Sequence, residues 1–307
     1  MNAIAMKQNP QSAIRNPQSI LLAWQGWKFA LPSDWSPIKI EGDFNKGFFA
    51  LADLERQRIG VRWQTLRKKA DVEKVITEAM RREVGQLACD ESTLSSSDRW
   101  TSARLYIEPE PAGRDVWIAH CRETGRLIEV VYHAMKRDRV LQHEIVPFVH
   151  NGGEPNGTAS DWSVFWMNVR LPTPMKLTGQ RLNVGDLTLS FSAAEGAIVI
   201  RQIAAAGVAL NRRPIDKWLA TLGEPKRYKP DGSGDEVKID SFEGTRLPLI
   251  RRRRQVWMRW IPASYVTYVL RDIEHDRLVL LRSPNDELAR EVITGLNRAN
   301  AREGGPA

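Results

Sequence analysis

The sequence is poor in cysteine. Its 307 residues include two, Cys89 and Cys121, and neither has the spacing of a Cys/His ligand pair. This argues against a disulfide framework and against a structural zinc site. No apolar run approaches the roughly 20 residues that span a bilayer. The apolar stretch 20–24 is also too short for the core of a signal peptide. These absences predict a cytoplasmic protein with no membrane segment.

Motifs that carry common chemistry are missing as well. There is no GxSxG, no Walker loop and no GxGxxG that opens a helix after a strand. Among the five histidines, His133 and His143 would lie on neighbouring strands, with Glu144 nearby, as a metal or acid–base pair requires. No third ligand has a diagnostic spacing. We therefore predict no metal, no cofactor and no enzymatic activity.

Tryptophan and positive charge are what the sequence has in excess. Eleven tryptophans are typical of well-packed sheet faces, with aromatic ligand platforms as the alternative. The net charge is +8, and residues 1–155 carry only +2 of it. A basic excess in the second half favours acidic partners, including nucleic acid.

Composition divides the chain into five segments. Residues 1–22 repeat an Asn-Pro-Gln-Ser motif and are expected to be a flexible leader. The stretch 151–161 is rich in Gly and Asn and is expected to be a linker. Between and after them we predict structured segments at 23–150 and 162–299, and a flexible tail at 300–307.

Both structured segments show strand alternation interrupted by one helical pattern. In the first, strands are expected at 27–32, 48–54, 58–65, 103–108, 116–122, 127–134 and 140–148, with a helix at 71–83 capped by Asp71. In the second, strands are expected at 165–171, 186–192, 197–204, 241–248, 255–261, 265–271 and 277–282, with helices at 214–222 and 287–297, the latter capped by Asn285 or Asp286.

The two segments also share dipeptides at nearly constant spacing, which indicates an internal duplication. The matches are Leu31-Pro32 with Leu171-Pro172, Val116-Trp117 with Val256-Trp257, and Asp138-Arg139 with Asp276-Arg277. The order of strands and helices agrees as well. The sequence therefore predicts an α+β protein of two tandem repeats, each an antiparallel sheet flanked by helices.

The first segment resembles a known family at one short motif. The aromatic-x-Leu-Pro strand, Phe29-Ala30-Leu31-Pro32, leads to Trp35 and then to a hairpin, a helix and a meander. This resembles the PsbP-like fold of PsbP, the Ran-binding import factors and DcrB-like domains, over 27–148 and 164–297. The second copy departs from it, with Met175 near the place of Trp35. The resemblance implies protein binding and transfers no functional residue.

One local pattern points to a binding surface. Arg251, Arg252, Arg253 and Arg254 stand in a row, and Trp260 and Tyr268 follow. Arginines bind carboxylate or phosphate with two parallel hydrogen bonds, and aromatic rings stack on bases. A charged strand edge that discourages aggregation would give the same pattern.

These features lead to three hypotheses about function. The first is a non-enzymatic binding or scaffold protein with an acidic protein partner. The alternative is nucleic-acid binding through the basic second repeat, with a salt-dependent affinity. The third is an apolar pocket lined by tryptophans, although we expect no small-molecule ligand.

Overall fold

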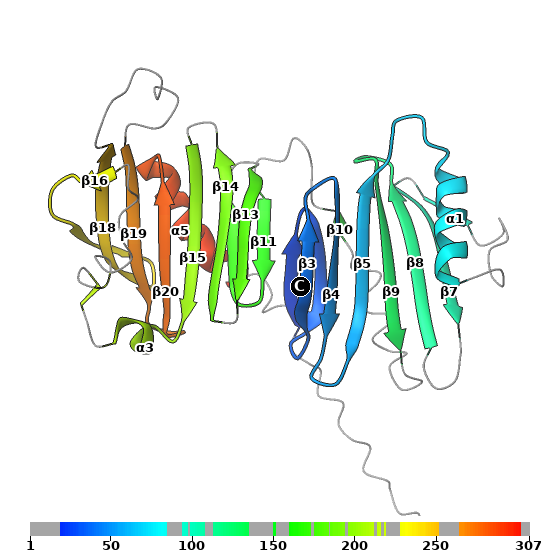
Figure 1. Ribbon diagram of the computed structural model, residues 1–307, viewed down its shortest axis with the longest axis horizontal. Helices are drawn as coiled ribbons and strands as arrows, with labels where there is room; N and C mark the ends of the chain where they lie inside the picture. Colours follow the sequence, from blue (N-terminus) through cyan, green and yellow to red (C-terminus); the bar gives the residue numbers. More distant parts are fainter. Residues whose placement is uncertain are drawn as a thin grey trace, which may run out of the picture. The chain divides into compact units, whose positions relative to one another are not determined.

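The chain folds into antiparallel β-sheets with few helices (Figure 1). The computed structural model describes residues 19–84, 94–97, 99–107, 113–134, 150–151, 160–172, 175–183, 185–193, 196–211, 214–215, 218, 228–251 and 264–301. Its strands are β1 Ser19–Trp24, β2 Trp27–Pro32, β3 Ser36–Gly42, β4 Lys46–Ala52, β5 Gln57–Thr65, β6 Leu94–Ser96, β7 Trp100–Ile107, β8 Gly113–Cys121, β9 Arg126–Ala134, β10 His150–Asn151, β11 Ser160–Val164, β12 Met167–Leu171, β13 Lys176–Asn183, β14 Asp186–Ala193, β15 Gly196–Ala204, β16 Tyr228–Pro230, β17 Asp235–Ile239, β18 Phe242–Arg251, β19 Ser264–Asp272 and β20 Arg277–Ser283. The helices are α1 Val72–Val84, α3 Ala206–Leu210 and α5 Asp286–Ala301.

The predicted α+β class, with helices flanking each sheet, is wrong. The described residues form three antiparallel sheets and only three helices, which makes the protein β-rich. The sequence pattern missed edge strands such as β3 and β13, in which no residue is buried. A strand without a buried face lacks the apolar alternation on which the prediction depended.

The chain divides into two compact units, residues 1–22 with 28–150 and residues 23–27 with 151–307. In the first unit a seven-stranded sheet has the order β3-β4-β5-β9-β8-β7-β6. Helix α1 packs on β7 and β8 through a buried apolar cluster. That cluster is Ile76, Ala79, Met80, Ala103, Val116, Ile118 and Leu127.

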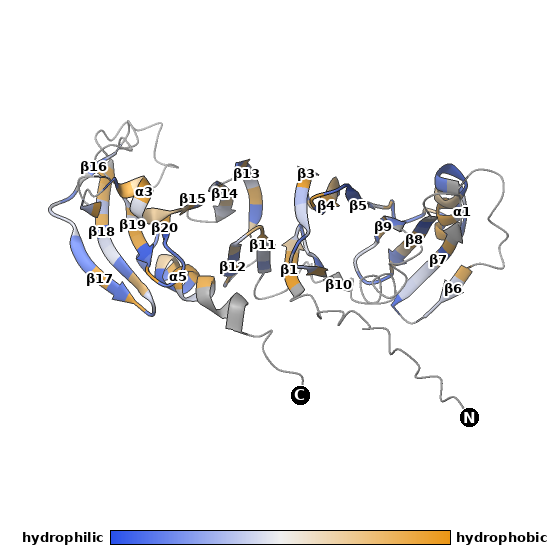
Figure 2. Cartoon of the chain, turned by 90° about the horizontal axis from the view of Figure 1, so that it is seen from below, coloured by the Kyte–Doolittle hydropathy of each residue, from blue (hydrophilic) through white to orange (hydrophobic). Residues whose placement is uncertain are grey.

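The second unit holds a sheet with the order β13-β14-β15-β20-β19-β18-β16, and β17 also pairs with β18. Side chains alternate between the two faces of a strand. Val269 packs with α3, and its neighbour Tyr268 bonds to Asp286 at the start of α5. Helices α3 and α5 therefore lie on opposite faces of this sheet (Figure 2).

The third sheet contains β1, β11 and β12. Strand β11 pairs with β12 along its whole length and with β1 at Ala23 and Ser163. Within the second unit, Trp162 of β11 meets two aromatic rings edge-on, Trp24 at 5.4 Å and Phe191 at 5.0 Å between ring centroids. Part of the tryptophan excess is therefore core packing.

Both long helices begin at the predicted caps. The Asp71 carboxylate accepts a hydrogen bond from the Lys74 amide at 3.1 Å. The Asn285 side-chain oxygen accepts from the amides of Glu287 and Leu288 at 2.9 and 3.3 Å. Each cap satisfies backbone donors that the first turn of a helix leaves unpaired.

The two seven-stranded paths have the same connectivity. In each, three strands form a meander, a helix follows, and the last strand of a second meander returns to pair with the third strand. The predicted match of Val116-Trp117 with Val256-Trp257 is not the one that this order gives. The β8–β9 hairpin closes with the pair Cys121–Arg126, and the β19–β20 hairpin closes with Asp272–Arg277. Counted from these pairs, Val116 is equivalent to Thr267. The pair Val256-Trp257 lies outside the described residues.

Helix α5 packs closely on β12 at one glycine. A Cβ atom at Gly295 would lie 2.4 Å from the backbone oxygen of Arg170, so any larger side chain must push the helix away. At Gly207, in α3, an added Cβ would meet only Asp276 at 3.8 Å, an ordinary contact.

We expect Gly295→Ala to lower the free energy of unfolding by about 1–3 kcal/mol, the usual cost of overpacking. Gly207→Ala is the control, and it should be neutral or slightly stabilising because alanine favours helices. Urea unfolding of the two variants checks this. Equal stability of both would show that α5 does not depend on its contact with β12.

Candidate functional site

A hollow of about 740 Å³ opens on the sheet of the first unit, beside the end of α1. Helix α1 covers β7 and β8, and the same face of β9, β5, β4 and β3 carries no helix among the described residues. Leu127 belongs both to the core under α1 and to the wall of this hollow. We call it the groove. Its lining is Glu41, Gly42, Asp43, Lys46, Gly47, Phe48, Arg62, Trp63, Gln64, Arg82, Leu127 and Glu129.

Two arginines at the groove are each held by a less exposed carboxylate. Arg82 Nη2 lies 2.7 Å from both carboxylate oxygens of Glu129, and Arg62 Nη1 lies 3.0 Å from Glu83 Oε1. Both arginine side chains are 56% exposed, whereas those of Glu129 and Glu83 are 9% and 15% exposed. The hydrogen bond to Glu129 raises the pKa of Arg82. Arg82 Nε also lies 3.8 Å from Glu83 Oε1. The carboxylates thus fix two guanidiniums that remain more than half exposed.

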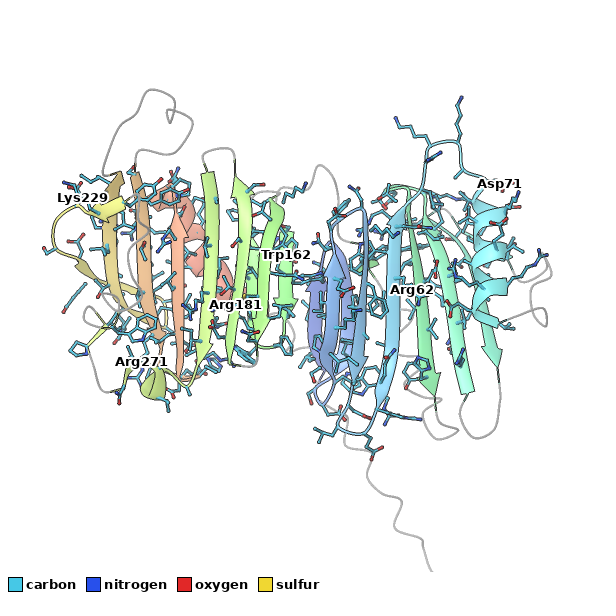
Figure 3. All side chains as sticks on the ribbon, in the orientation of Figure 1. Arg62, Asp71, Trp162, Arg181, Lys229 and Arg271 are labelled. Atoms are coloured by element: carbon cyan, nitrogen blue, oxygen red, sulfur yellow. The ribbon has the colours of Figure 1, made fainter. Side chains whose placement is uncertain are left out.

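The Phe48 ring in the lining of the groove lies near two cations. Phe48 has the Arg62 guanidinium 5.9 Å from its ring centroid and the Lys39 amine at 5.8 Å. Cross-strand pairing sets this order, because Phe48 pairs with Arg62 and Arg62 with Glu129. Figure 3 shows Arg62 on β5.

The far end of the groove is shaped by the β3–β4 turn. The Trp63 indole donates to the Asp43 carbonyl at 2.8 Å, and its ring lies over Gly47. A Cβ atom at Gly47 would come within 2.1 Å of that ring, so only glycine fits there without displacing Trp63. The end of the groove is therefore rigidly built.

Arg62, Arg82 and Glu129 were not predicted as site residues. No short motif contains them, because they come from β5, α1 and β9 and meet only through the sheet register. Hydroxyl, thiol and imidazole side chains are absent from the described lining of the groove. The lining holds three cations and three carboxylates beside the rings of Phe48 and Trp63. Its exposed guanidiniums can donate hydrogen bonds to acidic or polar groups.

The predicted basic run lies mostly outside the described residues. This applies to Arg252, Arg253, Arg254 and Trp260. The backbone of Arg251 ends β18, where it pairs with Tyr228. Binding by these residues remains a prediction.

Tyr268, the sixth predicted residue, is fully buried in β19. Its hydroxyl donates to Asp286 Oδ1 at 2.7 Å, and Arg246 Nε donates to the same oxygen at 3.0 Å. Burial and the hydrogen bond to Asp286 together raise the pKa of Tyr268 to about 12. In this structure Tyr268 joins the sheet to the first turn of α5.

The considered histidine pair is described only in part. His133 lies on β9, where burial lowers its pKa, and nearby arginines lower it further. His143 and Glu144 lie outside the described residues. Within the part of the chain that the structure describes, no three His, Cys, Asp or Glu side chains come together as metal ligands. No described helix is long and apolar enough to cross a membrane.

Comparisons with known proteins leave the family open. No family model matches the chain, and no curated protein matches it. One solved structure that is similar comes from Bacteroides thetaiotaomicron VPI-5482, at 15% identity and a TM-score of 0.31. The match covers 48% of this chain and 54% of that one, so this chain spans about half of its length. A likeness this low carries no argument, and the PsbP-like resemblance stays a prediction.

The Asp286 carboxylate should make stability depend on acid pH. Burial alone would raise its pKa, but hydrogen bonds from Arg246 and Tyr268 outweigh burial and lower it. As the pH falls, Asp286 is protonated in the unfolded chain before it is protonated in the folded protein. Its contribution to stability is therefore present above about pH 4 and is lost as the pH falls through the folded-state pKa.

We therefore expect Asp286→Asn to be less stable than the parent at pH 7, and to lose less stability between about pH 4 and pH 2. Urea unfolding across this range measures both effects. Glu291→Gln, on the exposed side of α5, is the control and should follow the parent curve. Parallel curves for Asp286→Asn and the parent would contradict the assignment.

The Arg82–Glu129 pair can be tested by a double-mutant cycle. Arg82→Met leaves the buried Glu129 carboxylate without this partner, which should cost about 1–3 kcal/mol. Arg82→Met with Glu129→Leu should recover much of that loss, because Leu280 fills the equivalent place in the second unit. Arg81→Met, next to Arg82 on the exposed side of α1, should change stability by less than about 0.5 kcal/mol.

Denaturant unfolding gives the four free energies of the cycle. The two side chains would be uncoupled if the double variant lost as much stability as Arg82→Met and Glu129→Leu lose separately, added together.

Proposed function

We propose that this chain is a non-enzymatic binding protein whose first unit holds an acidic segment of a partner protein in the groove. The observation that carries the proposal is the pair of fixed, exposed guanidiniums of Arg62 and Arg82, with the Phe48 ring beside them. A guanidinium matches the geometry of a carboxylate and forms two parallel hydrogen bonds with it.

The carboxylates of Glu129 and Glu83 lower the entropy cost of such binding. Free arginine side chains lose rotamer freedom when they bind, at about 0.5–1.5 kcal/mol for each side chain. Glu129 and Glu83 already restrict Arg82 and Arg62 before any partner arrives. The same carboxylates cancel much of the local positive charge, so the groove favours a segment with few well-placed acidic residues over a polyanion.

The residues that line the groove also favour the binding of a peptide over catalysis. Its described lining offers no hydroxyl or thiol nucleophile and no imidazole base, and Glu129 is occupied by Arg82. An acidic residue of the partner would bind the guanidiniums while an apolar neighbour packs on Phe48. We place the protein in the cytoplasm, where Cys121, buried as a free thiol, would stay reduced.

The proposal predicts which peptides bind and which variants lose them. Random peptides displayed on phage are selected on the full chain, with counter-selection on Arg62→Gln/Arg82→Gln. We expect Asp or Glu next to an apolar residue among the selected peptides. In fluorescence anisotropy, the double variant should bind them at least about tenfold more weakly.

Arg81→Gln is the control for the Arg82 substitution, since it removes one positive charge one residue away and should keep affinity within about twofold. If the double variant fails to fold, Arg62→Lys/Arg82→Lys keeps both charges and should still weaken binding, because lysine lacks the planar fork. Selected peptides without carboxylates, or acidic peptides that bind the double variant unchanged, would overturn the proposal.

A further inference from the structure

Arg282 of β20 is a half-buried arginine without a carboxylate. Among the described residues, its side chain has one hydrogen bond, from Nε to Thr267 Oγ1 at 3.5 Å. No ion pair joins it to any described Asp or Glu. Other arginines of the second unit are satisfied differently: Arg201 binds Asp186 at 2.8 and 2.9 Å, and Arg277 donates to the Trp166 carbonyl. Within the described part of the chain, most donors of Arg282 therefore have no acceptor.

The surroundings of Arg282 consist of hydroxyl groups and aromatic rings. Thr267, its cross-strand neighbour, is buried. Tyr228 and Tyr265 meet edge to face, 5.0 Å between centroids. The Tyr265 hydroxyl accepts a hydrogen bond from the Ala197 amide at 3.3 Å, which leaves its proton free to be donated. The cation thus lies in a partly apolar setting that offers further donors.

A partly buried, partly apolar position is unfavourable for a charge without a counter-ion. Burial lowers the pKa of Arg282, and the two tyrosines oppose this only in part. An arginine side chain nevertheless stays protonated in proteins. A charge taken partly out of water is stabilised when an opposite charge joins it. An anion is therefore the kind of partner that would stabilise Arg282.

The first unit shows that the fold itself does not require this arginine. In both β8–β9 and β19–β20 a four-residue turn separates the closing pair, Cys121 with Arg126 and Asp272 with Arg277. At the sixth pair from that turn the second unit has Thr267 and Arg282. The first unit has Val116 and Val131 there, which belong to the core under α1. A valine pair thus fills the same place with apolar packing.

We propose that Arg282, with Thr267 and Tyr265, forms a binding site for the carboxylate or phosphate group of a small molecule. The guanidinium supplies the charge and two parallel donors, and the Tyr265 hydroxyl supplies a third. The Tyr228 and Tyr265 rings form an apolar wall for the rest of the ligand. This site uses other residues than the groove and stands whether or not the groove binds a peptide.

The test measures oxyanion binding to the full chain. Inorganic phosphate, acetate and phenyl phosphate are titrated at constant ionic strength held with chloride, and binding is followed by isothermal calorimetry and by the thermal unfolding midpoint. We expect saturable binding and a rising midpoint with at least one of the first two probes, and which of them binds identifies phosphate or carboxylate as the group. Phenyl phosphate should bind more tightly than inorganic phosphate if the tyrosines form the wall.

Arg282→Leu should weaken binding at least about tenfold and should raise the midpoint without ligand, because the unpartnered charge is gone. Arg201→Leu is the control: it breaks an ion pair on the same sheet, so it should lower the midpoint and leave binding unchanged. Should Arg282→Leu fail to fold, Arg282→Gln replaces it in the titration. No saturable binding by the parent, or equal binding by the parent and the Arg282 variant, would overturn the proposal.

Discussion

The pairing of β5 with β9, and of β15 with β20, is the contact on which each unit depends. It joins strands far apart in the chain: Thr65 pairs with Arg126, and Ala204 with Arg277. Forming it costs the entropy of closing a long loop, which only a large sheet with a buried face can offset. Once formed, it brings the two meanders into one sheet. The cores under α1 and α3 and the wall of the groove all contain residues of these paired strands.

Charge placement follows from how much of each sheet face a helix covers. On the covered part the first unit has leucine, valine and isoleucine, and on the uncovered part arginines stand over carboxylates such as Glu129. A carboxylate with little exposure is stabilised by its arginine, and the arginine is oriented in turn. Arg282 departs from this pattern, because it is half-buried and pairs with no carboxylate among the described residues.

The sequence predicted the inner parts of the fold well and the edges poorly. Strands β5, β8 and β9 and helix α1 were found, because burial imposes apolar alternation or helical spacing on them. Edge strands β3 and β13 were missed because solvent on both faces imposes no pattern. The fold class failed for that reason: the missed strands made the helices look like a larger share of the protein.

The groove could not be predicted for a related reason. Arg62, Arg82 and Glu129 are ordinary charged residues in sequence, and only the register of β5 on β9 and the position of α1 bring them together. The basic run was visible because its residues are adjacent. A sequence shows directly only which residues are adjacent in the chain. Prediction from sequence therefore finds runs of like residues more readily than sites assembled from distant strands.

Because the two large sheets have the same connectivity, residues at equivalent positions in them can be compared. At the fourth pair from the hairpin turn, β9 has Glu129 and β20 has Leu280; at the sixth, β9 has Val131 and β20 has Arg282. Polar and apolar residues have exchanged places. Burying a polar residue under a helix costs free energy. We therefore expect polar residues only where no helix covers the face. The polar residues therefore lie at different levels of the same face, Glu129 beside Arg82 in the first unit and Arg282 with Thr267 in the second. If the two units arose by duplication, as the sequence predicts, the shared framework has been kept while its open surface has been reassigned, which is the pattern expected when two copies come to bind different ligands.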